Sequence, residues 1–271
     1  MSRPAAAALV ALALVLAGCG SAATPSTPTP TRTPTATPTP TPRSTAAALD
    51  PASVPGVSAD GVDVGRLTAA HDARLNRTSY RMNATVRRGP THLDVSVVTA
   101  AGPVPTYVRT VRPNRTREEY YDERYYRRQV VDGNVTYRIT PYVGRADFSG
   151  ASLIREYMSL ARYEPTGTDR VGGTPVVVLS AAAGDLRSGA FGDATTTRFA
   201  SSVRVDRNGV VRSFRFVATG TTADGRPFAV RVDLRVTGVG ETTVPTPGWL
   251  SAAREASRNV TATPATTAAG G

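Results

Sequence analysis

Apolar and polar residues alternate through much of residues 80–236, and this alternation constrains the fold more than any other feature of the sequence. The clearest example runs from Phe228 to Val236, where every second residue is Phe, Val or Leu and the residues between them are Ala, Arg or Asp. A period of two places apolar side chains on one face of a β-strand and polar side chains on the other. Each strand must therefore bury one face and expose the other, as in an antiparallel sheet.

Turn residues divide this region into about nine or ten strands. They are expected at 80–86, 93–97, 104–112, 117–121, 124–130 and 134–140, in a hairpin around Gly172–Gly173, and in strands that end at Val205, Thr219 and Val236. Two segments, 63–77 and 151–163, carry apolar residues at helical spacing. A sheet with one apolar face needs a cover, and these helices provide it. The predicted fold is therefore α+β: a large curved antiparallel β-sheet, an open half-barrel, with two amphipathic helices on its concave face.

The N-terminus has the pattern of an export signal. Arg3 precedes an apolar run from Ala5 to Leu16 that is too short to span a bilayer. The residues that follow, Leu16 to Cys19, resemble a lipobox, in which the cysteine becomes the lipidated N-terminus of the mature chain. The alternative is an ordinary cleavable signal, which would leave Cys19 as a free thiol. We expect a protein anchored in the cell membrane, on its extracytoplasmic face, through a lipid on Cys19.

Composition sets the other boundaries. Residues 24–45 are mostly Thr and Pro and cannot bury enough apolar surface to fold. The expected organisation is a signal peptide at 1–18, a lipidated N-terminus and disordered spacer at 19–56, a single domain at 57–250, and a mostly disordered tail at 251–271. Because Cys19 is the only cysteine, neither a disulfide nor a thiolate metal site can stabilise the domain.

The net charge of +11 comes entirely from arginine, since the chain has no lysine. Outside a cell, a basic surface favours anionic lipid head groups or surface-layer glycans as partners, and the export signal argues against nucleic acid. Arginine and tyrosine are concentrated between Tyr107 and Arg128. This stretch is either a binding surface or an ordinary hairpin with paired charges. If it binds, Arg124, Tyr125 and Arg127 are candidates for the rim of a site.

Asparagine is used in an unusual way. Five of the six asparagines begin an N-x-Ser/Thr triplet, the acceptor sequence for N-glycosylation. The candidate sites are Asn76, Asn83, Asn114, Asn134 and Asn259.

The sequence contains no recognisable catalytic motif. His71 lies on the apolar side of the first predicted helix, where a core position is more plausible than a role as a base. The one cluster of carboxylates, from Glu118 to Glu123, lies among arginines that can pair with it. We therefore expect no catalytic residue, no metal and no cofactor, and a monomeric protein that is not an enzyme.

Several short motifs carry a family resemblance: "GVSADGV" (56–62), "SYRMNATV" (79–86), "DRNGVVRSFRF" (206–216) and "VPTPGW" (244–249). Together with the lipobox and the Thr/Pro spacer, they resemble an uncharacterised family of haloarchaeal lipoproteins. The fold that this resemblance implies is that of the LolA and LppX/LprG lipoprotein carriers, an open half-barrel over helices that encloses an apolar cavity.

The resemblance implies that the protein binds or carries a lipid or another apolar ligand. The alternative is a structural or interaction component of the cell envelope or surface layer that has no ligand. The candidate lining residues of the cavity are Leu153, Tyr157, Met158, Phe214, Phe216, Phe228, Val230, Val232 and Leu234.

Overall fold

The computed structural model describes residues 49–102, 104–142 and 147–261. The signal peptide, Cys19 and most of the predicted spacer lie outside the described residues. The helical elements are η1 (Pro51–Ser53), α1 (Val64–Leu75), α2 (Ala151–Met158), η2 (Ala183–Asp185) and α3 (Leu250–Thr261). The strands are β1 (Val57–Ser58), β2 (Gly61–Val62), β3 (Tyr80–Arg88), β4 (Thr91–Thr99), β5 (Thr106–Arg112), β6 (Arg115–Tyr121), β7 (Arg124–Val131), β8 (Asn134–Pro141), β9 (Glu164–Val171), β10 (Thr174–Ala182), β11 (Thr195–Asp206), β12 (Val211–Thr221) and β13 (Pro227–Thr237).

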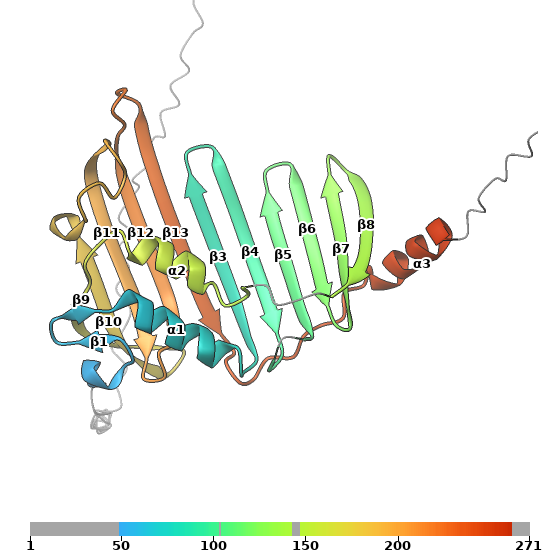
Figure 1. Cartoon of the computed structure of the whole chain (residues 1–271), viewed down its shortest axis with the longest axis horizontal. Coiled ribbons are helices and arrows are strands. Elements are labelled where there is room, and N and C mark those ends of the chain that lie inside the picture. Colours follow the sequence, from blue (N-terminus) through green and yellow to red (C-terminus); the bar gives the residue numbers. More distant parts are fainter. Residues whose placement is uncertain (1–48, 103, 143–146, 262–271) are drawn as a thin grey trace, which may run out of the picture. The chain divides into compact units, whose positions relative to one another are not determined.

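Eleven strands form one antiparallel sheet in the order β8-β7-β6-β5-β4-β3-β13-β12-β11-β10-β9 (Figure 1). Two meanders, β3–β8 and β9–β13, meet where β3 pairs with β13, for example at Ala84 and Leu234. The sheet is curved and does not close, so β8 and β9 are its two edges. The prediction of one dominant antiparallel sheet is confirmed, and β1 and β2 form a separate pair beside α1.

Helices α1 and α2 pack side by side on the concave face of this sheet, which we call the helical face (Figure 1). Asp63 caps α1 by accepting a hydrogen bond from the backbone N–H of Arg66 at 2.9 Å. Leu67 and Leu75 are buried under α1, as the spacing predicts. From α2, Ile154 and Met158 are fully buried, and each such side chain contributes about 1.5–3 kcal/mol. The predicted cover of two amphipathic helices is confirmed.

Helix α2 is shorter than the predicted helix at 151–163. It ends at Met158, and the chain then pairs with the end of η2 and the residue that follows it. Ala161 forms an isolated bridge with Leu186, and the backbone N–H of Arg162 donates to the carbonyl of Asp185 at 2.8 Å. These hydrogen bonds replace those of a further helical turn, although the apolar spacing continues beyond Met158.

Helix α3 packs against β7 and β8, and its contacts lie on the face of the sheet opposite to α1 and α2. Alternate tyrosines show this: Tyr121 joins the main core under the helical face, whereas Tyr120 and Tyr126 pack with Leu250 in a second cluster. The sequence predicted a mostly disordered tail from residue 251, and the structure differs because α3 continues to Thr261. Small residues such as Ala253 form the buried side of α3 and give little apolar periodicity.

Candidate functional site

A cavity of about 750 Å³ opens on the helical face, between α2 and the ends of β3, β4, β12 and β13. Tyr157 and Leu160 line it from the α2 side, and Phe228 and Val230 line it from β13. Phe191, in the loop between η2 and β11, lines a further part. Its walls are therefore mainly apolar.

Aromatic packing fixes the wall that β12 and β13 provide. The ring of Phe191 lies 5.3 Å from that of Phe228 and 6.2 Å from that of Phe216, measured between centroids. Tyr157 meets Phe216 edge to face at 5.1 Å. Gly220 makes this arrangement possible, because a Cβ at its position would lie 2.6 Å from Cε1 of Phe228. The wall is held in place by ring contacts that reach into the main core.

Four charged or hydroxyl side chains besides Tyr157 also line the cavity: Arg88, Thr91, Glu156 and Thr222. Arg88, at the end of β3, and Glu156, on α2, carry opposite charges, and both are exposed. Burial is the main cause that raises the pKa of Tyr157, and the charge of Glu156 adds to it. Tyr157 is therefore a neutral, weakly polar group in the wall. This arrangement can hold an apolar group.

The residues predicted to line a cavity divide into two groups. Tyr157, Phe228 and Val230 line the cavity beside α2. The others lie in the packed core between helices and sheet, where only Leu153 is half-buried and the rest are buried: Met158, Phe214, Phe216, Val232 and Leu234. Sequence reasoning missed Phe191 and Leu160. The signal for Phe191 was weak, because a single aromatic residue in a Gly-rich loop has no periodicity.

The three residues predicted to form a rim all lie on β7, and β5 and β6 separate β7 from β4, the nearest strand in the sheet that borders the cavity. Tyr125 and Arg127 are on the helical face, whereas Arg124 is on the opposite face because strand side chains alternate. The hydroxyl of Tyr125 donates to Glu119, which is 4% exposed and also accepts from Arg117 Nη2 at 2.7 Å. Burial, assisted by the hydrogen bond to Glu119, raises the pKa of Tyr125 to about 12. These residues do not form the rim of the cavity.

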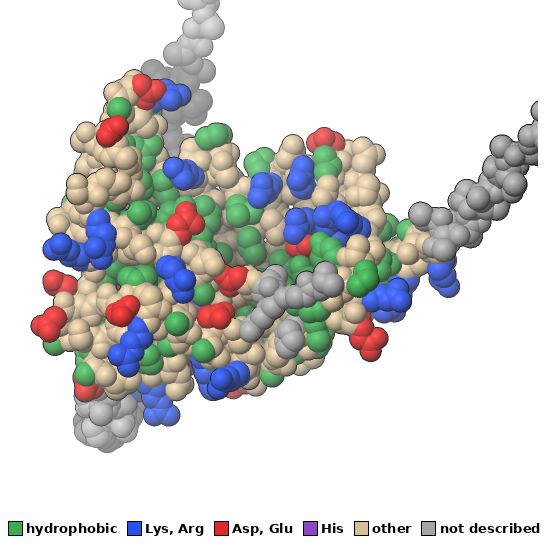
Figure 2. All heavy atoms as spheres, viewed as in Figure 1, with side chains coloured by type: hydrophobic (Ala, Val, Ile, Leu, Met, Phe, Trp, Pro, Cys, Tyr) green, Lys and Arg blue, Asp and Glu red, His purple; other side chains and the backbone are tan. Residues whose placement is uncertain are grey.

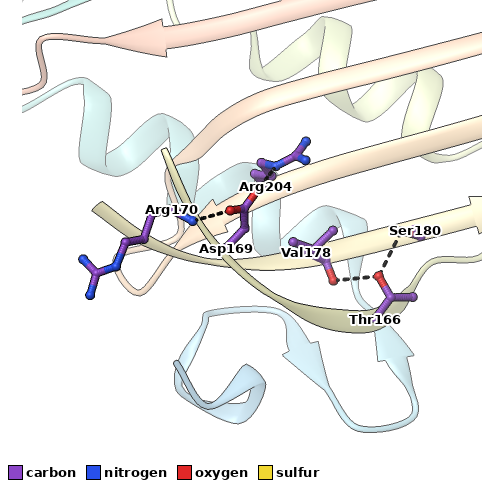
Figure 3. A network of polar contacts seen from close by, with 6 residues as sticks. All are labelled: Thr166, Asp169, Arg170, Val178, Ser180 and Arg204. Atoms are coloured by element: carbon purple, nitrogen blue, oxygen red, sulfur yellow. Dashed lines mark hydrogen bonds and ion pairs between the residues drawn. The ribbon is translucent and has the colours of Figure 1, made fainter. Parts of the chain in front are cut away.

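A second, polar groove of about 620 Å³ lies where β9, β11, β12 and β13 end. Figure 3 shows part of its network: the Asp169 carboxylate pairs with Arg204 Nε at 3.0 Å and accepts from the backbone N–H of Arg170. Nearby, the Thr166 and Ser180 hydroxyl oxygens are 3.0 Å apart across β9 and β10 (Figure 3). Arg212, which also lines the groove, pairs with the buried Asp206. Since Arg204 and Arg212 each have a carboxylate partner, we assign this network a structural role.

His71 is fully buried, as the prediction of a core position requires. Its Nε2 donates to the carbonyl of Ser149 at 3.0 Å, and its Nδ1 accepts from the backbone N–H of Val211 at 3.1 Å. Burial lowers the pKa of His71 and keeps the ring neutral. Within the described ranges, no three His, Cys, Asp or Glu side chains are placed to hold a metal ion. No helix in the described part of the chain is long and apolar enough to cross a membrane.

The candidate glycosylation sites differ in exposure. Asn83, Asn114 and Asn134 are exposed, on β3, in the β5–β6 turn and at the start of β8. Asn76 is half-buried, and its side-chain amide donates to Asp72 at 2.8 Å. The side chain of Asn259 lies outside the described residues. Glycosylation at these positions stays a prediction.

The open sheet, the helices on its concave face and the apolar cavity at their border define an α+β protein of the open half-barrel class. The chain belongs to DUF7537, a family of unknown function whose model matches residues 4–253. No curated protein matches the chain.

Solved structures show only distant similarity. MucB is 17% identical with a TM-score of 0.29, over 71% of this chain and 62% of MucB. In the Pseudomonas aeruginosa MucA/MucB complex, the matched chain is 15% identical with a TM-score of 0.25. This match covers 69% of the present chain and 64% of the matched chain. The Mycobacterium tuberculosis lipoprotein LppX is 10% identical with a TM-score of 0.27, over 67% of this chain and 98% of LppX. The match spans less than two thirds of the MucB chains, and similarity this low shows neither a shared ligand nor a shared partner. The resemblance to haloarchaeal lipoproteins stays a prediction.

Proposed function

We propose that this protein binds an apolar ligand, such as the acyl chain of a lipid, in the cavity beside α2. We further propose that it does so as a lipoprotein, anchored through Cys19 on the extracytoplasmic face of the cell membrane. The observation that carries the binding role is the volume of about 750 Å³ behind walls that are mainly apolar. Ligand sites typically occupy about 300–1,000 Å³ and are lined in this way.

The energetics favour a flexible apolar chain. Each methylene that leaves water contributes about 0.8 kcal/mol, so about ten buried methylenes contribute about 8 kcal/mol before the entropic costs of association. The charged Arg88 and Glu156 are exposed and do not have to lose their water. A chain can therefore enter without burying a charge.

The packed region between α1, α2 and the sheet is not where this ligand would sit. Phe216, Val232 and Met158 are fully buried there, and an acyl chain would have to displace them. The proposed site is instead at the end of the helix layer, where Tyr157 and Phe228 border open space.

The binding proposal is tested by filling the cavity. Ala194, which lines it, is changed to Trp, and the exposed Ala200 on β11 is changed to Trp as a matched control. Binding of cis-parinaric acid, a fluorescent single-chain fatty acid, is measured for each protein. We expect saturable binding to the wild type, at least about tenfold weaker binding to Ala194→Trp, and unchanged binding to Ala200→Trp. Equal affinity for the two variants, or no binding to the wild type, would contradict the proposal.

The anchor is tested separately. We expect the wild type to fractionate with membranes and the exported Cys19→Ser variant to be released, because a lipid cannot be attached to serine in this way. If exported Cys19→Ser protein still fractionates wholly with membranes, the anchor assignment is wrong, and the cavity proposal is unaffected.

A further inference from the structure

Arginines gather on the half of the helical face that carries no helix. Figure 2 shows their side chains grouped over β6–β8, beside an apolar strip. The register places Glu119, Arg127 and Arg138 next to one another across β6, β7 and β8. All three are on the helical face, because Tyr121, two residues from Glu119, belongs to the core under that face.

Arg127 and Arg138 are directly opposite each other in the β7–β8 ladder. Like charges in this position repel and destabilise a sheet. Glu119 is the neighbouring carboxylate in the register, but its Oε1 accepts from Arg117 and Tyr125, and its ion pair is with Arg117. Among the described residues, no ion pair joins Arg127 or Arg138 to a carboxylate.

The opposite face of the same strands shows the usual solution. There, Glu118 lies between Arg109 and Arg128 in the register, and it pairs with Arg128. The hydroxyl of Tyr107 also donates to Glu118. Each face thus has one glutamate, but only on the helical face are two neighbouring arginines left without a carboxylate partner.

Side-chain contacts fix the residues of β6 and β7 that surround these arginines. Glu119 is held by Arg117 and Tyr125, and the Tyr125 ring lies 5.1 Å from that of Tyr121. Arg127 is half-buried and Arg138 is exposed, so both can meet a ligand from solvent. Guanidinium groups bind phosphate oxygens through paired hydrogen bonds, and two of them side by side can hold one oxyanion.

We propose that Arg127 and Arg138, with Arg117 beside them, form a binding site for a phosphate-type oxyanion. The anion neutralises the repulsion between the two guanidiniums. It comes either from a small phosphorylated molecule or from the head group of an anionic phospholipid. The site is independent of the apolar cavity, because β4, β5 and β6 lie between β3 and β7.

The test uses the Arg127→Gln/Arg138→Gln double variant. The matched control is Arg81→Gln/Arg235→Gln, which removes two exposed arginines from the opposite face of β3 and β13. The first probe is inorganic phosphate. Its binding is measured as a change in the melting temperature at low ionic strength. We expect phosphate to raise the melting temperature of the wild type and the control but not that of the double variant. Without phosphate, the double variant should melt at least as high as the wild type, because the repulsion is gone.

The second probe is co-sedimentation with phosphatidylglycerol or phosphatidylcholine vesicles, using exported protein with Cys19→Ser in every variant. At least about tenfold weaker binding to phosphatidylglycerol in the double variant, with the control changed less than about twofold, identifies a lipid head group as the source. A response to phosphate without binding to vesicles identifies a small phosphorylated ligand. An equal loss in the double variant and the control, or no response to either probe, overturns the proposal.

Discussion

His71 joins three segments that are far apart in the sequence. It lies on α1, donates to Ser149 before α2 and accepts from the backbone of Val211 at the start of β12. Only a neutral imidazole can donate from Nε2 and accept at Nδ1 at the same time. Burial is the main cause that lowers its pKa, although the hydrogen bond to Ser149 and the charges of Asp72, Asp147 and Asp206 oppose this shift.

This geometry predicts a loss of stability in acid. The unfolded chain has a His71 pKa near 6.5 and the folded chain a lower one, so the unfolded state binds the proton more readily. The contribution of His71 is complete above about pH 6.5 and is lost as the pH falls through the folded pKa. We expect His71→Gln to reduce the free energy of unfolding by about 1–3 kcal/mol at neutral pH. The difference from the wild type should shrink by about pH 5, as measured by urea unfolding. A difference that is the same at both pH values would show that His71 does not titrate in this way.

At the scale of elements, α3 is a cover for a small apolar cluster on the face opposite to α1 and α2. Leu250 and Trp249 pack with Tyr120 and Tyr126, and Ala253 is fully buried against the sheet. The Arg254 guanidinium lies 5.4 Å from the centre of the Tyr126 ring. Because Trp249 is the only tryptophan in the chain, tryptophan fluorescence reports on the packing of this cluster.

We expect Ala253→Glu to release α3, because a buried carboxylate without a partner is costly. Trp249 emission should shift to the red, while cis-parinaric acid binding at the distant cavity stays unchanged. The control is Ser251→Glu, at an exposed position of the same helix. If Ala253→Glu unfolds the whole protein, or if both variants leave Trp249 unchanged, α3 is not a separable cover.

The elements also show what the sequence can predict and what it cannot. Alternation and turn residues predict the strands β3 to β8, and helical spacing predicts α1 and the start of α2, because these signals are local. The end of α2 at Met158 depends on contacts with distant residues and was not predicted. The pairing of β3 with β13 joins Ala84 to Leu234 and has no local signal. The face of a side chain depends on the exact register, and so Arg124 and Arg127, grouped in the sequence, lie on opposite faces of β7. The cavity depends on Phe191, which is placed by a loop.

At the scale of the whole described domain, the two halves of the sheet are stabilised differently. β12 lies between β11 and β13, and Phe214, Phe216 and Ala218 are buried beneath the helices. By contrast, β8 is an edge strand with no buried residue, and no described helix covers the helical face of β5–β8. Apolar burial dominates the stability of a domain, so the β11–β13 half should be the more stable half.

This asymmetry predicts the order of local opening in hydrogen exchange. Amides of β12 should exchange slowest, at rates set by global unfolding, because they open only when the core is lost. Amides of β7 and β8 should exchange earlier, since their opening exposes little apolar surface. Hydrogen exchange with mass spectrometry at peptide resolution measures both. Inorganic phosphate should slow exchange in β7 and β8 but not in β12, and the Arg127→Gln/Arg138→Gln variant should lose this effect. Equal protection of β8 and β12 would instead mean that the sheet opens as one unit, with α3 and the β3–β13 pairing coupling its halves.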